Sequence, residues 1–308
     1  MKSRMYSAQV KLLVQTLPEV AKETCFALHG GTAINLFVRE LPRLSVDIDL
    51  TYVSIEPREI SLQHINEALA RIKLSLETVL PNVRVIHRPK ICKLQISSQG
   101  AQIKIEVNQV GRGTLEIPKT MPLCQTAQDE FDAFCEIQLV SIGQLYGGKI
   151  CAALDRQHPR DLFDVKYLLE NEGFSEEIKT GFLLCLLSGD RPLHEMLNPN
   201  FQDQRTAMAN HFDGMSAEEF TYADFEQTRE QLVAEISKGL SDADKAFLLS
   251  VNNLSPDWSV YNFENFPAVR WKLLNLQKLR DNNPGKHREQ YEALEKLFDK
   301  QRPLNVAN

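Results

Sequence analysis

The first third of the sequence holds residues whose types and spacing suit phosphoryl transfer. Asp47 and Asp49 stand two residues apart in VDIDLTYV, and Glu106 lies in the later run QIKIEVNQV. Side chains two residues apart on a strand point to the same side. The pattern therefore predicts a pair of carboxylates able to bind a divalent cation. Glu106 would complete the site if its strand lies beside that of the two aspartates.

The chemistry that such acids serve depends on the ions they hold. Two cations about 3.5–4 Å apart would stabilise the attacking and leaving oxygens of an in-line displacement. Mg²⁺ is the expected ion, with Mn²⁺ as its substitute, because both accept carboxylate and phosphate oxygens. Glu106 is the best candidate to take the proton of the acceptor hydroxyl, since an acid beside a metal can act as a base.

A glycine pair precedes the acids. Gly30 and Gly31 close an apolar run and open a helical pattern, where backbone N–H groups uncovered by side chains can bind phosphate oxygens. The Thr32 hydroxyl can add one donor. Arg43 and Ser45 precede the aspartates and could reach the triphosphate, although Arg43 could equally form a surface ion pair. The sequence thus predicts an anion pocket beside the metal ligands.

A second group of charged residues lies in the middle of the chain. Lys149 shares a helical stripe with apolar residues, so it is either a lysine at the edge of the core or an ammonium that binds nucleotide phosphates. Asp161 and Asp164 share a helix face and fall in its first turn, where the helix dipole alone favours an acid. Arg156 and Arg160 could bind phosphates or pair with these acids.

Hydrophobic periodicity predicts the elements that position these residues. Alternating or buried apolar runs indicate strands over 24–30, 46–53, 82–88, 91–97 and 102–110. Helical spacing is found over 5–15, 32–40, 59–79, 139–155, 160–171, 175–188, 216–238 and 269–280. In the strand predicted over 102–110, one side carries Ile103, Ile105 and Val107, and the other side carries Lys104, Glu106 and Asn108. The pattern turns from mixed to helical near 115–140, which places a domain boundary there.

Composition narrows the class of protein. The composition, 43% hydrophobic and 25% charged, is typical of a globular protein, and the length of 308 residues suits two domains or one large domain with an appendage. No apolar run suits a membrane span or a signal peptide, so we expect a cytoplasmic protein that does not act at a membrane. The six cysteines form no CxxC pair and are interpreted as reduced thiols without a zinc site.

The formal net charge of −6 excludes a global basic field, but the charge is uneven. Residues 213–244 carry nine acids against two bases, and residues 270–302 carry nine bases against five acids. Solvated helix faces are the default interpretation of both. We interpret His29 by default as a histidine packed in the core and His158 as a structural residue of a loop. The aromatic group at 258–266 is interpreted as part of the core of the carboxy-terminal helices.

The stretch HGGTAINLFVRELPRLSVDIDLTYV (29–53) resembles the opening motif of the AbiEii/AbiGii-type toxin nucleotidyltransferases, of the DNA polymerase β-like superfamily. The motif positions are Gly30, Gly31, Thr32, Arg43, Ser45, Asp47, Ile48, Asp49 and Leu50. Downstream, 143–169 supplies the expected lysine, arginines and Arg-Asp-x-x-Asp: Lys149, Arg156, Arg160, Asp161 and Asp164. Two departures are the third acid, which is Glu106 where the family has Asp, and Thr32 where Ser is frequent.

The resemblance implies an α+β fold with a small mixed sheet of polymerase β-like nucleotidyltransferase type and helices on one side. The nucleotidyltransferase core would span 1–137. A mostly helical domain, 138–308, would contribute Lys149 and the 160–164 motif to the cleft. Lys149 would then bind the triphosphate as a catalytic residue, and Asp164 would act as a base or orient the acceptor.

The resemblance also implies a reaction and partners. A nucleoside monophosphate would pass from an NTP to an acceptor hydroxyl, with tRNA or another RNA as acceptor. The chain would be the toxin of a toxin–antitoxin or phage-defence system and would have an antitoxin protein as its partner. The basic stretch 270–302 is the candidate RNA contact. Two alternatives remain open: a kinase-like enzyme that transfers the γ-phosphate, and a catalytically silent nucleotide-binding interaction protein.

Overall fold

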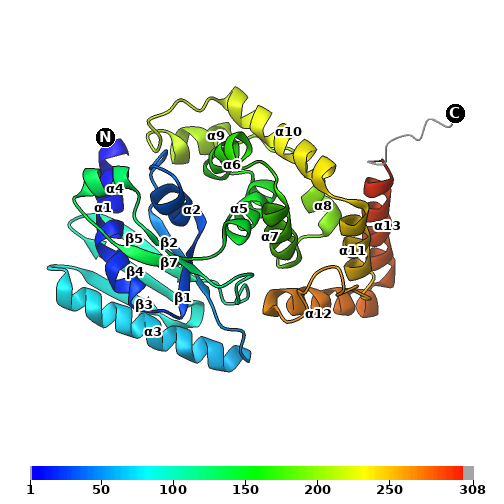
Figure 1. Ribbon diagram of the computed structural model, residues 1–308, viewed down its shortest axis with the longest axis horizontal. Coiled ribbons are helices and arrows are strands. Elements are labelled where there is room, and N and C mark those ends of the chain that lie inside the picture. Colours follow the sequence, from blue (N-terminus) through cyan, green and yellow to red (C-terminus); the bar gives the residue numbers. More distant parts are fainter. Residues whose placement is uncertain (1, 301–308) are drawn as a thin grey trace. The chain divides into compact units, whose positions relative to one another are not determined.

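The computed structural model describes residues 2–300, which form two compact units. The first unit comprises the chain up to Leu145 together with Arg205–Phe220; the second comprises Tyr146–Gln204 and the chain from Thr221 onward. Figure 1 labels their elements. The division falls inside the helix α5 (Ile142–Arg156), beyond the last strand of the sheet, which ends at Leu139, whereas the resemblance implied a boundary at 137/138.

The first unit is built on a mixed sheet. Its strands are β1 (Phe26–His29), β2 (Asp47–Tyr52), β3 (Arg84–Arg88), β4 (Lys93–Ser98), β5 (Ala101–Val107), β6 (Lys119–Pro122) and β7 (Glu136–Leu139). Among the described residues they form one seven-stranded sheet in the order β3-β4-β5-β2-β1-β7-β6. The pairs β2–β5 and β1–β7 are parallel and the other neighbours are antiparallel. The α+β class is therefore confirmed, and the first five strands were predicted; β6 and β7 were not.

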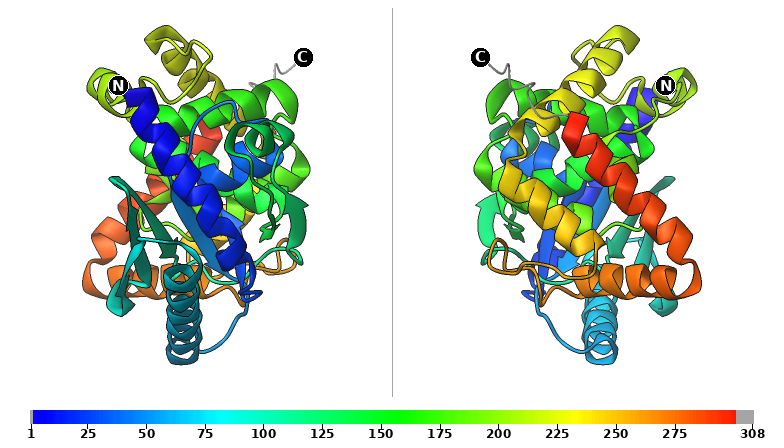
Figure 2. Two further views of the ribbon diagram at one scale, coloured as in Figure 1. Left: turned by 90° about the vertical axis from the view of Figure 1, so that its left-hand side faces the viewer. Right: turned by 90° about the vertical axis from the view of Figure 1, so that its right-hand side faces the viewer.

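Strand alternation gives β5 and the first half of β2 one buried apolar side and one more polar side. On β2, Ile48 and Leu50 are buried, and on β5, Ile103 and Ile105 are buried, as the sequence predicted. The helices α1 (Lys2–Ala21) and α3 (Arg58–Val79) pack against the sheet and each other, α1 on β5 and β7 and α3 on β3 and β4. Figure 2 shows α1 crossing the sheet obliquely. The polar side chains of β2 and β5 lie on the opposite face.

Three further elements complete the amino-terminal part of this unit. They are α2 (Gly30–Ala33), a π-helical segment (Ile34–Val38) that continues it, and α4 (Gln125–Phe131). The predicted helix over 32–40 is thus present but begins two residues earlier, directly after β1. The chain consequently passes from strand to helix at the glycine pair, as the sequence indicated.

Residues 205–220 join the first unit through backbone pairing. They contain α9 (Arg205–Ala207) and the π-helical segment Met208–Phe212. The Leu44 N–H donates to the Met215 carbonyl at 2.7 Å, and the Ser216 hydroxyl donates to the Pro42 carbonyl at 3.1 Å. This pairing attaches a segment of the predicted helical domain to the strand-rich unit, which sequence periodicity could not reveal.

The predicted helix over 216–238 therefore starts late. Its structural counterpart, α10 (Tyr222–Gly239), begins after Thr221, whose side chain accepts from the Asp224 N–H while the Asp224 carboxylate accepts from the Thr221 N–H. This reciprocal cap satisfies two backbone donors that the helix leaves unpaired and fixes its start.

The second unit is helical. It contains α5 from Tyr146 onward, α6 (Pro159–Asn171), α7 (Glu176–Leu187), α8 (Leu193–Leu197), α10, α11 (Asp242–Asn252), α12 (Pro267–Asn282) and α13 (Pro284–Lys300). Phe247 lies at the centre of an aromatic cluster with Trp258, Tyr261 and Phe263, which confirms the core interpretation of that group. No helix among residues 2–300 is long and apolar enough to cross a membrane.

One lysine of the basic stretch is part of the core. Lys272 is buried, and its ammonium donates to the carbonyls of Gly189 at 2.8 Å and Arg191 at 2.6 Å, just beyond the end of α7. Burial lowers the pKa of Lys272 to about 8. A neutral amine still has two N–H donors, so both hydrogen bonds survive deprotonation. Lys272 therefore holds the segment after α7 in place.

This burial predicts a pH-dependent stability. An unfolded lysine titrates near 10.4, so between about pH 8 and pH 10 the unfolded chain binds more protons and the folded state gains stability as pH rises, by up to about 3 kcal/mol. Lys272→Met should lose that gain. Free energies of unfolding from denaturant titrations at pH 7 and pH 10 check it, and identical pH dependence in variant and wild type would contradict it.

Candidate active site

The strand register brings the three predicted acids to one face of the sheet. In the parallel pair β2–β5, Asp47 is opposite Lys104 and Asp49 is opposite Glu106. Facing residues on neighbouring strands project to the same side, with Cβ atoms about 5 Å apart. The expected adjacency of the two acid-bearing strands is therefore present.

Two lysines lie among these acids. Lys104 places its ammonium 2.5 Å from Glu106 Oε2 and 3.8 Å from Asp47 Oδ2. Lys93, opposite Glu106 on β4, places its ammonium 2.7 Å from Glu106 Oε1. Partial burial raises the pKa of Glu106, but hydrogen bonds from both lysines outweigh it and lower that pKa below its usual value. A carboxylate stabilised in this way is a weak base, which favours metal ligation over proton abstraction for Glu106.

The donor set fits a hard divalent cation. The acids offer carboxylate oxygens, and the Asp47 and Glu106 side chains are 29% and 36% exposed, within reach of solvent and substrate. Within residues 2–300, no three carboxylate, imidazole or thiol groups are placed to hold one metal ion by themselves. Mg²⁺ commonly takes one or two carboxylates and completes its coordination with water and substrate phosphates. A pair of acids such as Asp47 and Asp49 could therefore hold such an ion together with water and substrate.

The glycine pair allows a close approach of backbone to these side chains. Gly30 has φ +76°, and a Cβ there would lie 2.6 Å from the Asp49 carboxylate oxygen Oδ2. At Gly31 a Cβ would lie 2.7 Å from Arg43 Nη2 and 3.1 Å from Ser45 Oγ. Both positions require glycine for space, and Gly30 also for its backbone conformation.

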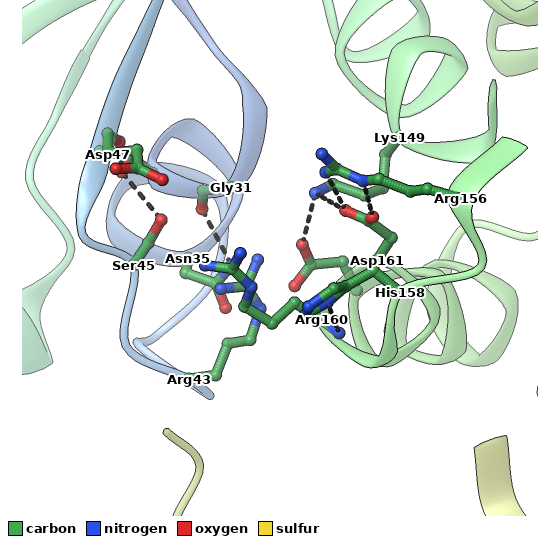
Figure 3. A network of polar contacts seen from close by, with 12 residues as sticks. Gly31, Asn35, Arg43, Ser45, Asp47, Lys149, Arg156, His158, Arg160 and Asp161 are labelled. Atoms are coloured by element: carbon green, nitrogen blue, oxygen red, sulfur yellow. Dashed lines mark hydrogen bonds and ion pairs between the residues drawn. The ribbon is translucent and has the colours of Figure 1, made fainter. Parts of the chain in front are cut away.

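The polar residues around the glycines are buried and bonded to the protein. The Thr32 hydroxyl lies 2.5 Å from the Asp47 carbonyl oxygen and 3.0 Å from Ser45 Oγ, and Arg43 donates to the Leu44 carbonyl at 2.9 Å. Figure 3 shows Arg43 and Ser45 below the Asp47 strand. Thr32, Arg43 and Ser45, predicted as nucleotide ligands, therefore brace the start of β2 against α2.

The second predicted group forms a buried ion cluster in the second unit. Lys149 lies 2.9 Å from Asp161 and 3.0 Å from Asp164, and Arg156 makes two bonds to Asp161 at 2.6 and 3.0 Å (Figure 3). Both aspartate side chains are 1% exposed and Lys149 is 7% exposed. Burial raises the pKa of Asp161, but the Lys149 charge and the Arg156 bonds bring it well below its usual value. Asp161 is thus an ionised structural centre.

The turn between α5 and α6 holds this cluster in shape. His158 accepts from the Arg160 N–H through Nδ1 at 3.2 Å and caps α6. Gln157 adopts the left-handed conformation, φ +49°, with its side chain buried. Its amide donates to the Asn200 carbonyl at 2.8 Å and accepts from Arg229 Nη1 at 3.1 Å. These bonds compensate for a backbone conformation that is costly for a residue with a Cβ.

Sequence reasoning missed several residues of these clusters. The sequence contained a signal for Lys104, because the alternation of polar and apolar residues placed it on the same strand face as Glu106. Lys93 had none, because its position depends on the β4–β5 register. Asn35, which donates to the Gly31 carbonyl at 2.9 Å, lies one helical turn beyond the glycine pair. His29 is partly exposed and stands opposite Asp49 on β1, so it borders the acidic face.

Comparison with models of known protein families assigns the chain to one of them. The family model "Nucleotidyl transferase AbiEii toxin, Type IV TA system" matches residues 11–275. The chain belongs to this family. It is therefore an AbiEii nucleotidyltransferase, and the match extends well beyond the motifs recognised in the sequence.

A solved structure shows the same fold. MenT4, a nucleotidyltransferase toxin from Mycobacterium tuberculosis H37Rv, superposes with a TM-score of 0.61 at 12% sequence identity, covering 88% of this chain and 93% of that chain. A search of curated proteins finds no match. The AbiEii assignment thus rests on the family model, with the fold supported independently.

Gly30→Ala should damage the site more than the fold. The added Cβ meets the Asp49 carboxylate, and displacing a ligand by about 1 Å can lower a rate by about 100-fold. Gly100→Ala is the matched control, because Gly100 also has positive φ, +84°, with nothing within 4 Å of its Cβ. Both should lose about 1–2 kcal/mol of unfolding free energy, whereas only Gly30→Ala should lose nucleotidyl transfer. Equal activity losses would contradict this account.

Asp161→Asn should destabilise the second unit by about 3 kcal/mol, because it takes the charged partner from the buried Lys149 ammonium on one side while Asp164 remains on the other. Asp155→Asn is the control, since Asp155 pairs with Arg191 at 3.0 Å on the surface and should cost at most about 1 kcal/mol.

The deficit of Asp161→Asn should also depend on pH. The lowered folded pKa means that the Asp161 contribution is complete above its unfolded pKa and declines as pH falls below about 4. Urea unfolding at pH 7 and at pH 3.5 tests this, and a deficit that grows on acidification would refute it.

Proposed function

We propose that the chain transfers a nucleoside monophosphate from an NTP to an acceptor hydroxyl, releasing pyrophosphate, and that the reaction requires Mg²⁺, with Mn²⁺ as its substitute. The observation that carries the proposal is the register that sets Asp49 opposite Glu106, with Asp47 on the same face. Asp47 and Asp49 bind the cation, and Glu106 supports it as the third carboxylate.

The protein's own residues prepare the substrate. The backbone at Gly30 and Gly31 approaches the acid face without covering it, which suits contact with phosphate oxygens. A bound divalent cation supplies neutralisation of the charge that develops on the transferring group. Thr32, Arg43 and Ser45 fix the turn that presents these groups.

Lys149 and Asp164 enter the proposal as catalytic residues through the family motif. An ammonium has three N–H donors, and the two ion pairs of Lys149 use two of them. A phosphate oxygen can take the third. Asp164, 3.0 Å from that ammonium and buried with it, orients the lysine.

The partner is proposed from the family's description as the toxin of a toxin–antitoxin system, and the acceptor from the resemblance of the sequence motifs. RNA, and tRNA in particular, is the proposed acceptor, and an antitoxin protein is the proposed partner. Exposed bases on α12 and α13 suit a phosphate backbone; they include Lys278, Arg280, Lys286 and Arg288. Lys272 is excluded from this surface because it is buried.

Asp47→Asn and Asp49→Asn should each lower transfer by about 1000-fold or more, because a lost metal ligand removes several kcal/mol of transition-state stabilisation. The assay incubates purified protein with each α-labelled or γ-labelled NTP, Mg²⁺ and total RNA, and follows the label into RNA. Asp132→Asn is the control: Asp132 is exposed and has φ +48°, which asparagine tolerates.

Label entering RNA from the α position alone supports the proposal. Transfer of the γ label would instead show a kinase-like reaction. Unchanged turnover in both aspartate variants would make the chain a catalytically silent binding protein.

A further inference from the structure

The face of the sheet that carries Asp47, Asp49 and Glu106, the acid face, also carries positively charged side chains. Lys104 and Lys93 each hold Glu106, and Lys104 also reaches Asp47. Taken by themselves, the three carboxylates and the two ammonium groups carry one net negative charge. The lysines are therefore counter-ions for groups that the proposed function assigns to a divalent cation.

Lys104 and a divalent cation require the same oxygens. The ammonium lies 2.5 Å from Glu106 Oε2 and 3.8 Å from Asp47 Oδ2, so it bridges the two strands that carry the acids. Mg²⁺ binds such oxygens at about 2.0–2.1 Å. An ammonium and a dication that share the same carboxylate oxygens repel each other, so binding of the dication weakens the contacts of the ammonium.

The contacts of the Lys104 ammonium with Asp47 and Glu106 can break at little cost. Lys104, Asp47 and Glu106 are each about one-third exposed, and pairs of this exposure contribute little to folding. The lysine side chain is flexible, with a point charge at its end. Its backbone is fixed in β5 opposite Asp47, so the ammonium stays near the acids when the contacts break.

We propose that Lys104 is a built-in counter-ion, which a divalent cation displaces from Asp47 and Glu106 and whose freed ammonium then pairs with the triphosphate of the substrate. The inference rests on the proposed function, because it assumes that these acids bind the cation. The displaced lysine stays protonated, so the exchange is of one cation for another. It assigns Lys104 the role of a positioning residue that couples metal binding to substrate binding.

The test measures binding separately from activity. Mn²⁺ affinity is determined by electron paramagnetic resonance of free Mn²⁺ or by calorimetry, first without nucleotide and then with inorganic triphosphate at saturating Mn²⁺. Lys104→Gln should bind Mn²⁺ about tenfold more tightly, since each pair of this exposure is worth at most about fivefold and two are removed. Its affinity for triphosphate should fall several-fold.

Two lysine variants serve as controls. Lys73→Gln makes the same change of charge on α3, where Lys73 pairs with Glu77, and should leave both affinities near wild type. Lys93→Gln removes contacts to Glu106 alone and should change Mn²⁺ affinity less than Lys104→Gln. Thermal unfolding confirms that each variant is folded.

The outcomes separate the inference from the proposed function. If Lys104→Gln matches wild type or Lys73→Gln in Mn²⁺ affinity, the counter-ion role is overturned while the metal site stands. If triphosphate affinity is unchanged, the second half of the role is overturned. If wild type binds no Mn²⁺, or Asp47→Asn binds it equally well, the metal dependence of the proposed function fails first.

Discussion

The alignment of β2 with β5 is the constraint on which the candidate site depends. The side-chain period of a strand is two, so a slip of one residue would turn Glu106 into the apolar core and bring Ile105 to the acid face. The buried residues of both strands oppose such a slip, because Ile48, Leu50 and Ile105 pack in the core. The hydrophobic face thus fixes the geometry of the polar one, and the acids need no direct bonds to each other.

The sequence predicted which side chains of β2 and β5 share the face with the acids, and the reason is physical. Strict alternation in VDIDL and QIKIEV assigns each side chain to one side of its strand, and that assignment holds whatever the neighbouring strands are. It could not predict that β5 rather than β4 lies beside β2, since pairing is decided by long-range packing. The resemblance to the family implied that the two acid-bearing strands are neighbours. The observed register shows that β2 and β5 are paired.

What could not be predicted depends on contacts far apart in the sequence. The role of Lys93 requires the β4–β5 register, and the attachment of 205–220 to the first unit requires the bonds from Leu44 and Ser216. Thr32 and Ser45 were assigned to nucleotide binding from their positions alone. Their burial shows that a hydroxyl next to the glycine turn can serve the turn itself. Sequence spacing identifies neighbours of a ligand but not which way each side chain is turned.

The two charged clusters use the same groups under different solvation, and solvation decides what each can do. Asp161 and Asp164 are shielded from water, so separating them from Lys149 leaves buried charges unpaired at a cost of several kcal/mol. That cluster keeps one arrangement and suits a residue that must be held in a fixed orientation. Asp47, Lys104 and Glu106 remain in contact with solvent, so water replaces a lost partner at a cost of about 1 kcal/mol or less. Only the exposed cluster can exchange an ammonium for an incoming cation without unfolding its surroundings.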